Sequence, residues 1–320
     1  MIRAIVYCCI GIAALFYAWL RQRRTVSPLV LAPILLAVAN TAYVQISQRP
    51  FPEPLRVSQT LDEVAYYADG SFGGQPSVVV NQLTRRIPGS QPVLWFTYES
   101  LFMALLLCCA IFVGHRNYWR VVGAITLAAA AGILCYRLLP ACGPAYLLGD
   151  DCYYGTGIAC GYMVSGHPQL VDIELRFPRN AMPSLHMAWA LLIWFFLRRR
   201  RWLRWLGLVY CILIGLSTLA FGEHYLIDLC AAFPFALALW ASFIDSLTAR
   251  TRAGIAICSF AGYLLWVVAV RFFVEAFWWS PVLPWAAAIA NMVIPVWVVL
   301  RSGTPSRDLS RSDATTAQFR

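Results

Sequence analysis

The sequence predicts an all-α fold, a multi-pass transmembrane helix bundle of about nine helices. Hydrophobic residues make up 60% of the 320 residues, charged residues make up only 12%, and the mean hydropathy is +0.65. A soluble protein of this size has no way to bury so much apolar surface, because large exposed apolar patches drive association. Disorder is excluded as well, since a disordered chain combines low hydrophobicity with high charge. The 13 Trp, 15 Tyr and 18 Phe residues suit aromatic belts at two membrane surfaces.

Nine apolar runs are candidates for membrane-spanning helices, because a hydrocarbon core of about 30 Å needs roughly 20 residues per helix. They cover residues 2–20, 27–46, 92–114, 120–139, 183–198, 203–221, 224–247, 253–276 and 281–300. Two long loops, 47–91 and 140–182, separate them on one side. The first loop contains an amphipathic stretch, Leu61 to Tyr67, that is a candidate for lying on the surface.

The distribution of arginine predicts the orientation, since all 25 basic residues are arginine. Sixteen lie in alternate short loops and in the tail: Arg21, Arg23, Arg24, Arg116, Arg120, Arg198 to Arg201, Arg204, Arg250, Arg252, Arg301, Arg307, Arg311 and Arg320. The opposite side holds seven, spread over longer segments: Arg3, Arg49, Arg56, Arg85, Arg86, Arg176 and Arg179. The positive-inside rule places the first set in the cytoplasm and both long loops outside a cell membrane. Clusters interrupted by apolar runs argue against a nucleic-acid-binding face.

The eleven cysteines show no metal-binding spacing, and no CxxC occurs. Eight fall inside apolar runs, where cysteine behaves as a small hydrophobic residue. The other three, Cys142, Cys152 and Cys160, share one outer loop, where two of them are able to pair if the compartment is oxidising.

Two of the four histidines are placed for chemistry. His186 ends the sequence Ala-Met-Pro-Ser-Leu-His, where the outer loop becomes the fifth predicted helix, and Pro183 suits the first turn of that helix. His224 lies in Gly-Glu-His-Tyr-Leu-Ile-Asp at the start of the seventh. The chain descends and returns between them through two helices of roughly 20–30 Å each. Both histidines are therefore expected at the same outer level of the membrane.

Asp228 follows His224 by four residues, so on a helix the two side chains are neighbours. A carboxylate beside an imidazole fixes its tautomer and stabilises positive charge on it. A carboxylate within an apolar run is costly without such a partner. The pair predicts an oriented histidine that serves as a nucleophile or a base.

Candidate phosphate ligands lie on the same side. Arg137, Arg176 and Arg179 offer guanidinium groups, which bind phosphate with two-pronged hydrogen bonding. Ser184 adds a hydroxyl and the free N–H groups of a helix N-terminus. Together with the histidines, these residues suit phosphoryl transfer at a membrane surface.

Pro-Ser-Leu-His at 183–186 and His-Tyr-Leu-Ile-Asp at 224–228 resemble the type 2 phosphatidic-acid phosphatase superfamily. The form of the first motif is similar to the branch containing inositol phosphorylceramide synthases. The resemblance implies a six-helix catalytic core over 27–247. Residues 1–26 and 248–300 are then an accessory N-terminal helix and two accessory C-terminal helices, and 301–320 is a disordered cytoplasmic tail.

The resemblance also implies a mechanism without metal or other cofactor. His224 attacks phosphorus and forms a phosphohistidine, Asp228 orients it, and His186 protonates the departing oxygen before activating water or an alcohol. Ser184 and arginines hold the phosphate oxygens. The sequence departs from the family pattern at Thr218, which stands after Ser217 where arginine is expected. The lysine of the family's first motif is also absent, and Arg137 and Arg179 are the candidates to replace the missing charges.

Two enzymatic readings follow, because transferases and hydrolases share these residues. The first is transfer of a phosphate-linked headgroup from a phospholipid or lipid-linked phosphate onto a lipid or glycan alcohol. The alternative is a lipid or polyprenyl phosphate phosphatase. A transporter predicts polar residues near mid-membrane, whereas the histidines here cluster at one end. Among other charged residues, Glu99 is expected to bond between helices, and Arg271 to pair with Glu275 four residues later.

Overall fold

A computed structural model describes residues 9–14, 16, 17, 20, 55–115, 117–148 and 179–302. Every regular element in these ranges is a helix, which confirms the all-α prediction. The predicted span 27–46, most of the span 2–20 and nearly all of the tail 301–320 lie outside the described residues.

The helices from residue 90 onward match the predicted spans and make the chain a multi-pass membrane protein. Five are long and apolar enough to cross a bilayer: α7 (Tyr118–Cys135), α11 (Leu203–Ala220), α12 (Leu226–Phe243), α13 (Ala249–Phe272) and α14 (Leu283–Arg301). The predicted span 92–114 is a broken pair, α5 (Ser90–Glu99) and α6 (Leu101–Phe112), whose axes differ by 57°. The helix α10 (Leu185–Leu197) is apolar but shorter.

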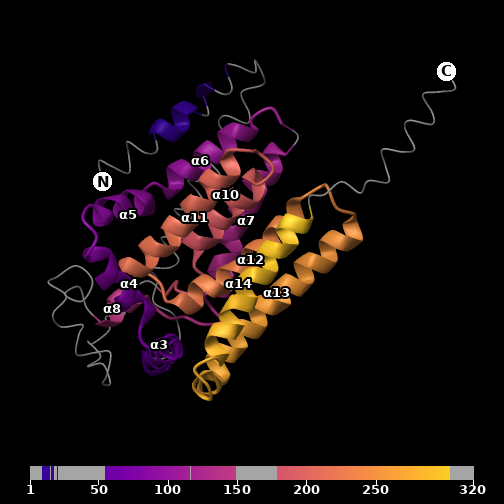
Figure 1. Cartoon of the computed structure of the whole chain (residues 1–320). Coiled ribbons are helices and arrows are strands. Elements are labelled where there is room, and N and C mark those ends of the chain that lie inside the picture. Colours follow the sequence, from indigo (N-terminus) through magenta and orange to yellow (C-terminus); the bar gives the residue numbers. More distant parts are fainter. Residues whose placement is uncertain are drawn as a thin grey trace, which may run out of the picture.

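The core of the bundle is built around α12, which packs against α7, α10, α13 and α14 (Figure 1). Its large side chains Phe235 and Trp240 are fully buried. In contrast, α13 and α14 expose large apolar side chains such as Leu265 and Ile294. In a membrane these faces contact lipid, which removes the penalty that water would impose on them.

The predicted outer loop 47–91 is largely helical, which corrects the sequence reading. It contains α3 (Leu55–Gly70) and α4 (Pro76–Arg85), joined by a short turn. The stretch Leu61 to Tyr67, a candidate for a surface segment, belongs to α3, which packs against α12, α13 and the short 3-10 helix η2 (Val274–Trp278).

One face of α3 is buried against the rest of the chain. Asp62 and Asp69 are seven residues apart, so they share a helix face with Ala65, and all three are fully buried. Acidic residues in a helix usually mark a solvated face, and here they mark a buried one, because each binds a distant segment of the chain.

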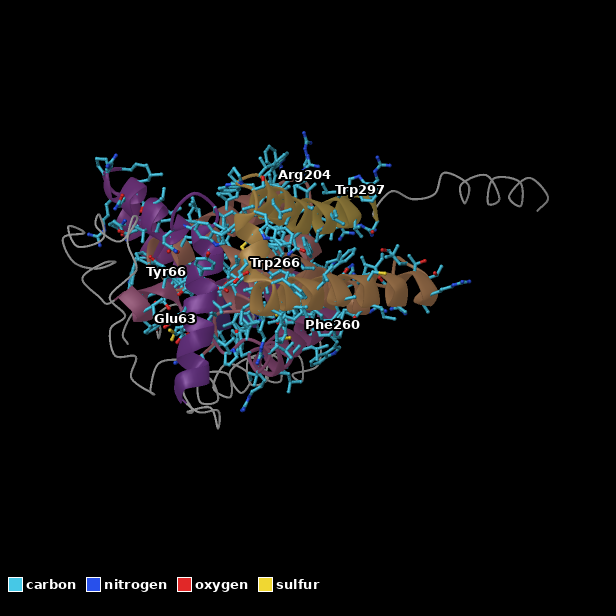
Figure 2. All side chains as sticks on the ribbon, turned by 90° about the horizontal axis from the view of Figure 1, so that it is seen from below. Glu63, Tyr66, Arg204, Phe260, Trp266 and Trp297 are labelled. Carbon is cyan, nitrogen blue, oxygen red and sulfur yellow. The ribbon has the colours of Figure 1, made fainter. Side chains whose placement is uncertain are left out.

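The arginine-rich end of the bundle lies at the opposite end of α10 from His186. Arg198, next to the last residue of α10, donates to the carbonyls of Phe195 and Val299 at 2.8 and 3.1 Å and lies 4.6 Å over the Trp240 ring. Trp297, labelled in Figure 2, is exposed. The guanidinium carbon of Arg301 lies 5.2 Å from the centre of its ring. Cations near the last carbonyls of helices are favourably placed.

Arg271 does not pair with Glu275, contrary to the prediction. Its guanidinium donates to the carbonyl of Leu138 instead. The reason is local, because α13 ends at Phe272 and Glu275 lies in η2, so the expected helical spacing of four residues is broken.

Candidate active site

The turn between α11 and α12 holds the backbone of His224 in place. Thr218 offers its carbonyl to two N–H groups, those of Glu223 at 3.0 Å and His224 at 3.3 Å. Gly222 has a φ of +65°, which favours glycine. The backbone at Gly143 approaches so closely that a Cβ there would lie 2.2 Å from the Glu223 carbonyl oxygen. A second segment of the chain therefore supports the turn from outside.

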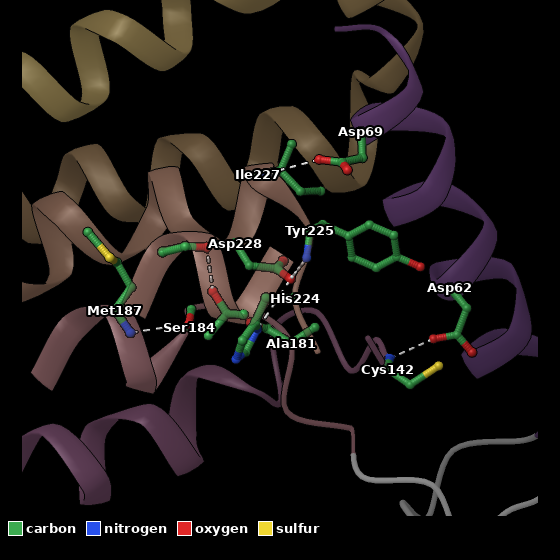
Figure 3. A network of polar contacts seen from close by, with 12 residues as sticks. Asp62, Asp69, Cys142, Ala181, Ser184, Met187, His224, Tyr225, Ile227 and Asp228 are labelled. Carbon is green, nitrogen blue, oxygen red and sulfur yellow. Dashed lines mark hydrogen bonds and ion pairs between the residues drawn. The ribbon is translucent and has the colours of Figure 1, made fainter. Parts of the chain in front are cut away.

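The imidazole of His224 is almost completely buried and is held at Nδ1. This nitrogen lies 3.0 Å from the carbonyl oxygen of Ala181 and 3.5 Å from Oδ2 of Asp228 (Figure 3). A carbonyl oxygen only accepts hydrogen bonds, so Nδ1 must carry the hydrogen in the neutral ring. The lone pair is then on Nε2, which is the arrangement that a nucleophilic histidine needs.

Asp228 ties the two motifs together. Its Oδ2 accepts the N–H of Tyr225 at 2.8 Å, and its backbone carbonyl accepts the N–H of Ser184 at 3.2 Å. The sequence reading put His224 within the helix, but α12 begins at Leu226. The carboxylate, in the first turn of α12, reaches back over the helix N-terminus and so still meets His224.

His186 faces His224, as the helix lengths and arginine distribution predicted. The two ring centroids lie 5.8 Å apart, with the planes inclined by 63°. Nδ1 of His186 is buried and makes no hydrogen bond to the described residues. Instead the ring stacks on Tyr98 of α5 at a centroid distance of 4.5 Å and an angle of 17°. Sequence reasoning missed Tyr98, because an aromatic residue inside an apolar run looks like any other membrane aromatic.

Ser184 caps α10 rather than standing inside it. Its hydroxyl oxygen accepts the N–H of Met187 at 3.3 Å, which leaves its own hydrogen to donate. Pro183 was expected in the first turn, but it precedes the cap, and α10 begins at Leu185. The buried Ser184 hydroxyl is thus at the helix N-terminus, one turn or less from His186.

The residues of this site lie within a segment that matches a known protein family. A family model described as the PAP2 superfamily matches residues 65–242, more than half of the chain. The chain belongs to the PAP2 superfamily. Searches of curated proteins and of solved structures gave no significant match. Membership supports a phosphatase-type enzyme that acts on lipid-linked phosphate, and it confirms the superfamily resemblance seen in the motifs.

The PAP2 match starts within α3 and ends within α12, so it contains both histidines, Asp228 and Ser184. At the position where the family pattern has arginine, Thr218 is fully buried and its hydroxyl donates to Ile214 and Gly215 carbonyls of its own helix, both at 3.0 Å. Thr218 therefore supports the His224 turn through its backbone.

The three predicted phosphate-binding arginines have different surroundings. Arg179 is nearly buried, forms an ion pair with Asp62 of α3 and donates to the Pro140 carbonyl at 3.4 Å. Arg137 is exposed in the turn after α7. Arg176 lies outside the described residues. The structure thus joins Arg179 to Asp62 of α3. Arg179 lies two residues before Ala181, whose carbonyl holds His224.

Asp62 also accepts the backbone N–H of Cys142 at 2.8 Å, which fixes the segment containing Gly143. The Cys142 thiol is free and buried, and burial raises its pKa well above the usual value. Cys152 and Cys160, the other two cysteines considered for a disulfide from the sequence, lie outside the described residues.

Asp69 holds the N-terminus of α12 from outside. Its Oδ1 accepts the N–H of Ile227 at 3.2 Å, and the side chain is fully buried (Figure 3). Burial raises the pKa of this carboxyl well above its ordinary value, and the nearby charge of Asp228 acts in the same direction. Asp69 was not predicted, because its partner is 158 residues away in the sequence.

No group of three or more His, Cys, Asp or Glu side chains in the described part of the chain is arranged to hold a metal ion.

Glu99 is half-buried, and its Oε2 makes no hydrogen bond to the described residues.

Proposed function

We propose that this PAP2 protein is a membrane phosphotransferase that works through a phosphohistidine on His224. It takes a phosphate-linked headgroup from a phospholipid or lipid-linked phosphate and passes it to a lipid or glycan alcohol, as inositol phosphorylceramide synthases do. One observation carries the proposal. Nδ1 of His224 is held by the Ala181 carbonyl and Asp228, which leaves Nε2 as the attacking atom beside His186.

In the first step, Nε2 of His224 attacks phosphorus and a P–N bond forms as the P–O bond to the leaving alcohol breaks. His186 gives its proton to the departing oxygen. The positive charge that develops on the His224 ring is stabilised by Asp228, whose Oδ2 lies 3.5 Å from Nδ1. The ring separation of 5.8 Å lets both histidines reach one phosphoryl group.

In the second step, His186 is neutral and takes the proton of the acceptor hydroxyl. The acceptor oxygen attacks phosphorus, the P–N bond breaks, and His224 returns to its starting form. An alcohol gives a new phosphodiester, whereas water gives hydrolysis. The PAP2 match favours hydrolysis as the second candidate, and the Pro-Ser-Leu-His form of the motif favours transfer.

For the phosphate oxygens we propose the Ser184 hydroxyl, the N-terminus of α10, Arg137 and Arg176. Arg179 adds positive charge while Asp62 holds its guanidinium. We further propose that the reaction needs no metal, because these groups already supply the positive charge and hydrogen-bond donors that phosphoryl transfer needs. The arginine-rich opposite end supports a site on the extracytoplasmic side of the cell membrane.

The experiment is an assay of purified full-length protein with radiolabelled phospholipids and polyprenyl phosphates, with and without an alcohol acceptor. A new labelled phosphodiester supports transfer, and free phosphate supports hydrolysis. EDTA should leave the rate unchanged. His115→Ala is a matched control, since His115 is exposed in the loop between α6 and α7. Failure of the wild-type protein to turn over any member of the panel would contradict the proposal.

A further inference from the structure

The break between α5 and α6 places an aromatic side chain on the second catalytic histidine. The two helix axes differ by 57° at Ser100. The carbonyl of Thr97, which a straight helix would pair with a later N–H, accepts instead from the Ser100 hydroxyl at 2.9 Å and from Tyr210 of α11 at 3.3 Å. The break is thus supported by specific hydrogen bonds and directs the last turn of α5 toward the site.

Tyr98, in that last turn, contacts both segments that carry histidines. Its ring stacks on His186 and lies 6.2 Å from Phe221 in an edge-to-face arrangement. Phe221 closes α11 three residues before His224 and also meets Trp95 at 5.2 Å. Trp95 and Tyr98 therefore belong to one aromatic cluster, but the stacking contact with His186 is made by Tyr98.

The contact has a chemical consequence, because Nδ1 of His186 has no hydrogen-bond partner among the described residues. The face of an aromatic ring attracts a cation. Among the described residues, the titratable side chains whose rings contact His186 are Tyr98 and His224, and a positive charge on His224 opposes one on His186. A stacked Tyr98 offsets that repulsion when His186 is protonated.

We propose that Tyr98 is a positioning residue for His186, which holds the imidazole by stacking and favours its protonated, acidic form. This inference rests on the proposed function, in which His186 protonates the leaving oxygen. It assigns to α5 the positioning of the second histidine, where the sequence shows only an apolar run.

The test compares Tyr98→Phe and Tyr98→Leu, with Trp95→Leu as the matched control from the same cluster. Phenylalanine keeps the ring face, so Tyr98→Phe should stay within about threefold of the wild-type rate. Tyr98→Leu should lower kcat about tenfold and move the alkaline limb of the pH–rate profile down by about 0.5 to 1 pH unit, because the acidic form of His186 is then lost at a lower pH. Trp95→Leu should leave the position of the limb unchanged.

A second measurement keeps the inference testable without turnover. The chain has four histidines, so NMR of histidine-labelled protein can follow the titration of His186 directly. The midpoint should fall in Tyr98→Leu and stay near wild type in Tyr98→Phe. An unchanged midpoint in Tyr98→Leu, or an equal fall in Trp95→Leu, would overturn the assignment. An inactive wild-type protein would instead contradict the proposed function alone.

Discussion

The two histidines of the site face each other but are held by different forces. His224 is fixed by polar contacts, since its Nδ1 meets the Ala181 carbonyl and Asp228, and its backbone N–H binds the Thr218 carbonyl. His186 is fixed by a stacked ring, and its Nδ1 makes no hydrogen bond to the described residues. The difference matches the proposed roles. A nucleophile must keep one tautomer, which hydrogen bonds enforce, whereas a residue that releases and recovers a proton needs a contact that tolerates both states.

The largest effect is expected at His224, the histidine held by polar contacts. His224→Ala should lower turnover by more than about a thousandfold, because the substitution removes the proposed attacking atom. Labelled product formation measures it, with His115→Ala as the control that retains activity. Turnover that persists in a folded His224→Ala protein would remove the basis of the comparison.

The effect of replacing His186, the stacked histidine, is expected to depend on the substrate. His186→Ala should lower turnover of a lipid phosphate by about 100- to 10,000-fold, because an alkoxide leaves poorly without a proton. A nitrophenyl ester of the same phosphate has a good leaving group and should largely rescue the first step. The rescue should be absent in His224→Ala, so a burst of nitrophenol from that variant would show that the roles are assigned wrongly.

Asp228→Asn separates the two polar contacts that hold Nδ1 of His224. The Ala181 carbonyl still accepts the Nδ1 hydrogen in this variant, so the tautomer is retained and only the charge is lost. We expect a fall in kcat of about 10- to 100-fold with little change in KM, a smaller loss than when the tautomer is also wrong. A steady-state titration with substrate gives both constants. A loss as large as that of His224→Ala would mean that Asp228 alone sets the tautomer.

The smallest effects are expected at Asp69, a residue of α3 that binds the N-terminus of α12 beside His224. Asp69→Asn keeps an oxygen for the Ile227 N–H, whereas Asp69→Leu leaves it unpaired and should cost about 1–3 kcal/mol of unfolding free energy. Thermal unfolding in detergent measures both variants.

The raised pKa of Asp69 also predicts a pH dependence. The folded protein holds this proton more tightly than the unfolded chain. Its contribution to stability is therefore full below the ordinary value of 3.8 and is lost as pH rises through the higher folded value. Asp69→Asn, which does not titrate, should gain stability relative to wild type as the pH rises above the ordinary value of 3.8. A constant difference as the pH rises would contradict a protonated Asp69.

The features that the sequence predicted correctly are those with local causes. Apolar length gives the spans, arginine clusters separate the two ends, and spacing of four residues joins His224 to Asp228. Helix rise and the arginine distribution together predicted that both histidines lie at the same level, and in the structure their rings are neighbours.

The features that were missed depend on partners far apart in the chain. Asp62 and Arg179 are 117 residues apart, and Asp69 and Ile227 are 158 apart. The stacking of Tyr98 on His186 depends on a helix break that no proline or glycine marks in the sequence. No periodicity indicates such contacts, so α3 was predicted as a loop and the ion pair of Arg179 with Asp62 was not expected.

The most direct measurement is to identify the bond that forms on the enzyme. Protein mixed with phosphorus-labelled lipid phosphate, stopped in alkali and digested, should yield one labelled peptide with phosphorus on Nε2 of His224, resolvable from the Nδ1 isomer by phosphorus NMR. The label should disappear in His224→Ala and accumulate when the acceptor is withheld. Label on Nδ1 or on another residue, or steady turnover without any labelled peptide, would contradict the account.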